Sequence, residues 1–73
     1  MQLEEKLKRL RRLDDLIRRK ATGSPNQLAD KLDVSRRTVF RLIDFLKNFG
    51  APIAYCGVKQ RYYYREEGWQ LQL

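Results

Sequence analysis

Apolar residues in the first part of the chain recur at intervals of three and four positions, the spacing of one face of an α-helix. The opposite face carries acidic residues four positions before basic ones, an order that stabilises a helix by about 0.2–0.5 kcal/mol per pair. These pairs are Glu4–Lys8, Glu5–Arg9, Asp14–Arg18 and Asp15–Arg19, and the apolar positions are Leu3, Leu7, Leu10, Leu13, Leu16 and Ile17. The pattern predicts an amphipathic helix over residues 3–20, with Gly23 as its C-terminal cap.

A second, shorter helix is predicted over residues 25–32. Ser24 fits an N-cap, Pro25 occupies the first helical position, and Gln27 completes the pattern of a capping box. The apolar positions of this segment are Leu28, Ala29 and Leu32.

A third helix is predicted over residues 36–49. Ser35 is another N-cap, Gly50 fits the C-terminal cap, and Pro52 prevents the helix from continuing. At 100° per residue the core face consists of Val39, Ile43 and Leu46, with Leu42 and Phe49 on one flank. The opposite face consists of Arg37, Arg41, Asp44 and Asn48, bordered by Arg36, Phe40 and Lys47.

The rest of the chain has the pattern of strands. Strand-forming residues occupy both ends of the segment 53–65, and residues 57–60 separate them as a turn, which predicts a β hairpin. A four-residue loop pairs Tyr55 with Tyr62 and Ile53 with Tyr64. Residues 66–73 form a C-terminal strand or tail, whose apolar positions are Trp69, Leu71 and Leu73.

Composition narrows the classes of function. Sixteen Lys and Arg against nine Asp and Glu give a net charge of +7, which favours an acidic partner, nucleic acid first. The absence of His removes the commonest general base and metal ligand, and a single Cys cannot form an internal disulfide. We therefore expect no enzymatic activity, no cofactor and no metal. No apolar run approaches the roughly 18 residues of a membrane span, so we expect no membrane partner.

The segment from Leu28 to Val39 has the spacing that a helix-turn-helix requires. Ala29 is small where two helices must cross closely, Val34 is an apolar plug in the turn, and Ser35 caps the next helix. With the later positions Arg41, Ile43, Leu46, Gly50, Pro52 and Ile53, this string resembles the winged helix-turn-helix domains of bacterial regulators, of the DeoR and biotin-repressor types. The resemblance extends over roughly residues 10–64.

The resemblance implies a mainly α fold with a small β hairpin, formed by a single three-helix winged helix-turn-helix domain over residues 1–73. It also implies that the helix 36–49 enters the major groove of double-stranded DNA and that the hairpin is the wing. The expected base contacts are Arg36, Arg37, Thr38 and Arg41, and the expected backbone contacts are Ser35, Lys47, Lys59, Gln60 and Arg61. Phe40 either contacts a thymine methyl or a sugar, or packs beneath the hairpin.

Two positions depart from the pattern of these families. Asp33 stands where the turn usually has Gly, although Asp tolerates the left-handed region better than most residues. Leu42 stands where DeoR-type sequences often have Asp. No effector or catalytic domain follows within the chain, so the resemblance implies a DNA-binding domain without a sensor.

The leading hypothesis is a small bacterial or phage transcriptional regulator, cytoplasmic and without enzymatic activity. The alternative is a winged-helix module that binds a protein partner through Phe40, Phe45 and Trp69. A third interpretation, binding of single-stranded nucleic acid on residues 62–64, is disfavoured because strand alternation leaves only one of the three tyrosines facing outward.

Surplus apolar residues in the third helix and the tail predict a homodimer, which would present two recognition helices to two half-sites. Cys56 is expected to be a small, partly buried apolar residue.

Overall fold

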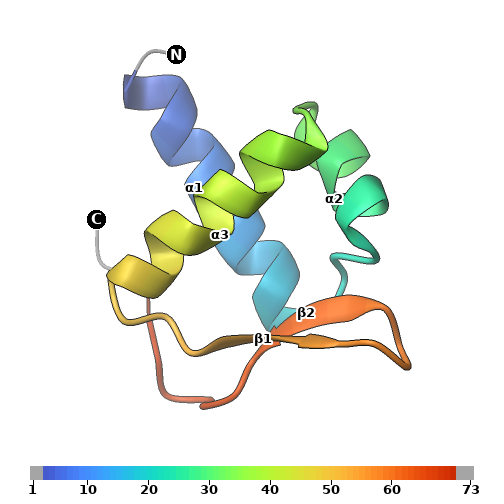
Figure 1. Cartoon of the computed structure of the whole chain (residues 1–73). Helices are drawn as coiled ribbons and strands as arrows, with labels where there is room; N and C mark the ends of the chain where they lie inside the picture. The colour runs from blue at the N-terminus through green and yellow to red at the C-terminus, as the bar shows by residue number, and fades with distance from the viewer. Residues whose placement is uncertain (1–2, 71–73) are drawn as a thin grey trace.

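The computed structural model describes residues 3–70. Three helices are followed by one antiparallel hairpin, in the order that the sequence predicts (Figure 1). This confirms the predicted class, a mainly helical fold with a small β hairpin. The elements are α1 (Leu3–Arg18), α2 (Pro25–Leu32), α3 (Arg36–Asn48), β1 (Ile53–Cys56) and β2 (Arg61–Tyr64).

The end of α1 differs from its prediction. The helix ends at Arg18 rather than at residue 20, and Lys20, not Gly23, adopts the left-handed conformation that stops it, with φ 56°. The Lys20 N–H donates to the Ile17 carbonyl at 3.0 Å, and the Ala21 N–H donates to the Leu16 carbonyl at 2.9 Å. These two bonds form a Schellman motif, which satisfies the last carbonyls of the helix without a glycine.

The boundaries of α2 and α3 follow their capping residues. Ser24 and Gln27 form the predicted capping box, and Ser35 accepts a hydrogen bond from the Thr38 N–H at 3.1 Å. Between the helices Asp33 is left-handed, at φ 55° and ψ 49°, as the prediction for this turn requires. Gly50, at φ 94°, lies just beyond the C-terminus of α3, where a left-handed residue ends the helix.

One hydrophobic core joins the three helices to the hairpin. Its central side chains come from α1, α2 and α3, and the hairpin closes it with Ile53 and Tyr62. The largest fully buried side chains are Leu10, Leu13, Ile17, Leu28, Leu46, Val39 and Thr22. In α1 the buried positions are Leu10, Leu13, Leu16 and Ile17, with Leu7 half-buried, so the predicted apolar stripe faces the core.

Three of the four predicted ion pairs on the polar face of α1 are present, with N–O distances of 2.6–3.9 Å. Among the described residues Glu4 and Lys8 do not pair within 4.0 Å.

The hairpin has the predicted register, with Tyr55 opposite Tyr62 and Ile53 opposite Tyr64. Thr22, the one fully buried polar residue among those described, attaches β2 to the loop between α1 and α2. Its hydroxyl oxygen accepts a hydrogen bond from the Tyr62 N–H at 2.8 Å. The outer edge of β2 therefore gains a side-chain partner where a third strand would otherwise lie.

The described part of the C-terminal segment contains no strand. Residues 65–70 run as turns and irregular backbone, while Leu71 and Leu73 lie outside the described residues. Trp69 packs on the core, with its ring centre 5.1 Å from that of Tyr64. The half-buried Trp69 ring therefore covers the hairpin of its own chain. Part of the apolar surface from which the sequence predicts a homodimer is covered in this way.

Candidate nucleic-acid interface

The outward face of α3 is polar and cationic. The helix buries Val39, Leu42, Ile43 and Leu46 and exposes Arg36, Arg37, Arg41, Asp44, Lys47 and Asn48. Figure 1 shows α3 crossing in front of α1, with its outer side uncovered by any other element in the described part of the chain. Four cations and one anion on this face give a local charge of +3, from the exposed groups just named. A cationic helix face of this kind fits the major groove of DNA, which is wide enough for an α-helix.

Two arginines occupy the first two positions of α3, and the first turn contains no acidic residue. The N-terminus of a helix carries about half a positive charge, so cations there are electrostatically unfavourable. The same backbone N–H groups and the two guanidinium groups together form a favourable place for an anion such as a phosphate. Ser35 lies at this end as the N-cap. Thr38 is half-buried, and its hydroxyl lies 3.0 Å from that of Ser35, so these two predicted contacts share one hydrogen bond.

Phe40 is the apolar exception on the exposed face of α3. Its side chain is 41% exposed, and it is not part of the hydrophobic core cluster. The guanidinium carbon of Arg36 lies 5.6 Å from the centre of the Phe40 ring. In the hairpin, the rings of Tyr55 and Tyr62 are 4.8 Å apart. Burial and the neighbouring Tyr55 raise the pKa of Tyr62, and the positive charge of Arg36 partly offsets this rise.

The tip of the hairpin carries the second predicted cationic group. Lys59 and Gln60 are exposed and Arg61 is half-buried, with Gln60 in the left-handed region at φ 51°. A shallow hollow of about 190 Å³ on this hairpin is lined by Lys20, Cys56, Lys59, Arg61 and Tyr63. The structure thus brings Lys20, at the end of α1, next to the cations of the wing. Sequence patterns give no signal for this contact, because it depends on the way the left-handed Lys20 turns the chain.

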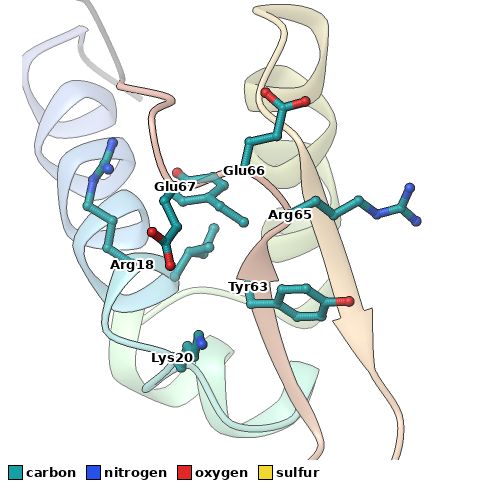
Figure 2. A pocket seen from close by; sticks show the side chains of 8 residues that line it. Arg18, Lys20, Tyr63, Arg65, Glu66 and Glu67 are labelled. Atoms are coloured by element: carbon teal, nitrogen blue, oxygen red, sulfur yellow. The ribbon is translucent and has the colours of Figure 1, made fainter.

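A larger hollow, of about 550 Å³, lies between the end of α1, β2 and the segment that follows β2. In Figure 2, Arg18 and Lys20 come from the α1 side and Glu66 and Glu67 from the segment after β2. Tyr63 and Arg65 extend over the hairpin, away from α1. Cations and carboxylates are mixed along this hollow, so its lining does not favour an anion as the cationic hairpin tip does.

Residues 3–70 contain neither a metal-binding cluster nor a membrane-spanning helix. No group of three or more side chains with metal-binding chemistry is close enough together to hold a metal ion. No helix in this range combines the length and the apolar character that crossing a membrane requires.

Comparison with known proteins places the chain in a family. A family model described as an HTH domain matches residues 7–64, which include α2, α3, both strands and most of α1. Searches of curated proteins and of solved structures give no significant match. The matching family is one of DNA-binding domains and not of enzymes. The chain therefore belongs to the helix-turn-helix (HTH) domain family, and its three helices with a β hairpin give it the winged form.

Proposed function

We propose that the chain is a sequence-specific regulator of transcription that binds double-stranded DNA as a single domain over residues 1–73. The observation that carries this proposal is the exposed cationic face of α3, which starts at a capped helix N-terminus without acidic residues. The cost of placing Arg36 and Arg37 at the positive end of a helix is offset when a polyanion binds there. The net charge of +7 acts in the same direction.

The proposed contacts divide into base readout and backbone positioning. Arginine reads guanine through two hydrogen bonds to O6 and N7, and the side chains of Arg36, Arg37 and Arg41 are exposed on α3. The base contacts are Arg36, Arg37, Thr38 and Arg41. The wing tip and the ends of α3 bind phosphates, which fix orientation without reading sequence. The backbone contacts are Ser35, Lys47, Lys59, Gln60 and Arg61.

Selection of bound duplexes from a random library tests this function. The proposal predicts that selection enriches one consensus containing guanines, and that the duplex affinity falls steeply with salt, with a slope of about −0.9 in log K against log[salt] for each phosphate contacted. An unenriched pool together with a flat salt dependence would contradict DNA binding as the function.

A second candidate function is protein binding through the C-terminal end of α3. Phe49 is 54% exposed, and its ring centre lies 4.9 Å from that of Phe45, over whose ring Lys6 is placed at 4.4 Å. This apolar patch lies on the flank of α3 away from the cationic face. A partner bound here would show an affinity that depends on Phe49 and changes little with salt, whereas DNA binding shows the opposite behaviour.

The same patch supports the proposal that the regulator is a homodimer, in a bacterial cytoplasm. Two copies would present recognition helices about 34–36 Å apart, one turn of DNA. Sedimentation equilibrium of the intact chain, of a chain ending at Arg65, and of Phe49→Lys tests the dimer. A monomer at tens of micromolar for the intact chain contradicts it. A dimer lost only in Phe49→Lys assigns the contact to α3, and one lost only on truncation assigns it to the C-terminal tail.

A further inference from the structure

Arg36 and Phe40 form a contact pair one helical turn apart on α3. The guanidinium carbon of Arg36 is 5.6 Å from the centre of the Phe40 ring, within the range of a cation–π contact. Such a contact limits the rotamers of the long arginine side chain before any ligand binds. The guanidinium group therefore lies at a defined place on the α3 surface, and the exposed ring lies beside it.

The fold does not require either side chain at its position. Phe40 is 41% exposed and lies outside the hydrophobic core cluster, so its ring adds little to packing. Arg36 is the first residue of α3, where the helix dipole disfavours a cation. A pair with these properties suits a ligand that offers hydrogen-bond acceptors and an apolar group side by side. The major groove of DNA offers this combination, because guanine presents two acceptors and thymine presents its C5-methyl group.

The separation of the pair lies between one and two base-pair steps. Residues four apart on a helix are separated by about 6 Å along its axis, and stacked base pairs by about 3.4 Å. The guanidinium carbon of Arg36 lies 5.6 Å from the centre of the Phe40 ring, so the two side chains can reach neighbouring base pairs.

We propose that Arg36 and Phe40 act as one reading unit for a guanine and an adjacent thymine in the major groove. Arg36 donates two hydrogen bonds to O6 and N7 of the guanine, and the Phe40 ring covers the methyl group of the thymine. This proposal rests on the proposed function, and it names the base step that α3 recognises. Phe40 is then a residue that determines specificity.

Replacing each thymine of the selected duplex by uracil, one at a time, tests this unit, since it removes a single methyl group. We expect one replacement, next to a guanine, to raise Kd about fourfold, the effect of exposing one buried methyl group. In Phe40→Ala the same replacement should have no effect. Val58→Ala, which truncates another exposed apolar side chain of the same chain, is the matched control and should keep the fourfold effect.

Arg36→Ala gives an independent readout, because it should relax the preference for guanine at the base pair next to the sensitive thymine and at no other. Thermal unfolding of each variant confirms that the exposed substitutions leave the fold intact. If the native chain binds its duplex specifically but no uracil replacement changes Kd, or if the effect persists in Phe40→Ala, the reading unit is wrong while the proposed function stands. If no duplex is bound specifically, both are wrong.

Discussion

The arginines that open α3 occupy positions that the helix itself disfavours. Arg36 and Arg37 lie in the first turn, where the helix dipole favours acidic side chains, and the turn contains none. Replacing a positive charge in this proposed binding site should therefore raise the stability of the fold and weaken DNA binding. Ser35 keeps the helix start intact by capping it, so the arginines can be changed without losing the element.

Arg37→Glu should make the protein more stable and abolish DNA binding. A carboxylate in the first turn gains about 0.3–1 kcal/mol from the helix dipole, and a Glu four residues before Arg41 adds about 0.2–0.5 kcal/mol. Urea unfolding should show the gain, and duplex titration should show the loss. Arg37→Gln is the control, with a smaller change in both quantities. An Arg37→Glu protein that binds duplex as tightly as the native chain would show that α3 is not the interface.

Arg41 and Lys59 should affect DNA binding in different ways. Arg41→Ala is expected to weaken binding to the best site by about 1–3 kcal/mol and to relax base preference at one position. Lys59→Ala, at the wing tip, should weaken binding to all sequences about equally and reduce the salt slope by about 0.9. Competition between the selected site and scrambled duplexes distinguishes the two. Equal loss on both duplexes for Arg41→Ala would remove it from the base contacts.

At the scale of elements, the turn between α2 and α3 carries a conformational cost. Asp33 is left-handed, at φ 55°, although it has a Cβ atom. Its N–H donates to the carbonyls of the last turn of α2, and the Val34 N–H donates to the Ala29 carbonyl at 3.0 Å, so the backbone requires this conformation. Asp tolerates the left-handed region only in part, while Gly adopts it freely.

Asp33→Gly should therefore stabilise the protein by up to about 1 kcal/mol, with α2 and α3 unchanged. Asp33→Ala should destabilise it, because Ala has neither the freedom of Gly nor the polar side chain of Asp. Unfolding of both variants in urea measures the difference. A loss of stability in Asp33→Gly would mean that the Asp33 side chain contributes more than its backbone conformation costs.

The helix starts and the hairpin are predicted correctly from sequence because they depend on residues close together in the chain. The starts of α2 and α3 follow from Ser24 and Ser35, which act on backbone groups within three residues. The hairpin register follows from loop length and alternation. The end of α1 is mispredicted because Lys20 takes the left-handed conformation that glycine usually supplies. Thr22 gives no sequence signal, because its hydrogen-bond partner is the Tyr62 N–H, 40 residues away.

At the scale of the molecule, α1 and the hairpin are joined by a polar contact beside the core. The Tyr64 hydroxyl donates to Asp14 at 2.6 Å, and Arg18 donates to the same carboxylate at 3.3 Å. The guanidinium carbon of Arg18 also lies 5.3 Å from the centre of the Tyr64 ring. Burial, followed by the hydrogen bond and the negative charge of Asp14, raises the pKa of Tyr64 well above its usual value near 10.

This pKa shift makes the stability sensitive to alkaline pH. Above pH of about 10 the unfolded chain releases the Tyr64 proton while the folded chain retains it, so stability falls as pH rises and is fully present below that pH. Tyr64→Phe should cost about 1–2 kcal/mol at pH 7 through the lost hydrogen bond to a carboxylate. It should also remove the Tyr64 contribution to the alkaline decline.

Urea unfolding at pH 7 and between pH 9 and 11 measures both effects. Tyr63→Phe is the control, because no hydrogen bond of its hydroxyl is present among the described residues; it should change stability at pH 7 by less than about 0.5 kcal/mol. An alkaline decline as steep in Tyr64→Phe as in the native chain would contradict the role of this tyrosine.

The candidate site is less predictable from sequence than the fold. Helical periodicity predicts which residues of α3 face outward, and all but Thr38 of the predicted α3 contacts are exposed. Periodicity does not predict that Lys20 joins the wing cations or that Trp69 covers Tyr64. These contacts depend on how the hairpin lies on the helices, and residue spacing does not contain that information.

We expect the outer face of α3 and the wing tip to bind duplex DNA. Backbone amide shifts of the intact, isotope-labelled chain, followed by NMR during titration with the selected duplex, test it most directly. DNA binding through this surface predicts the largest changes from Ser35 to Arg41 and at Lys59 to Arg61, with little change at Phe49. Changes centred on Phe49 and α1, with residues 35–41 unaffected, would contradict it.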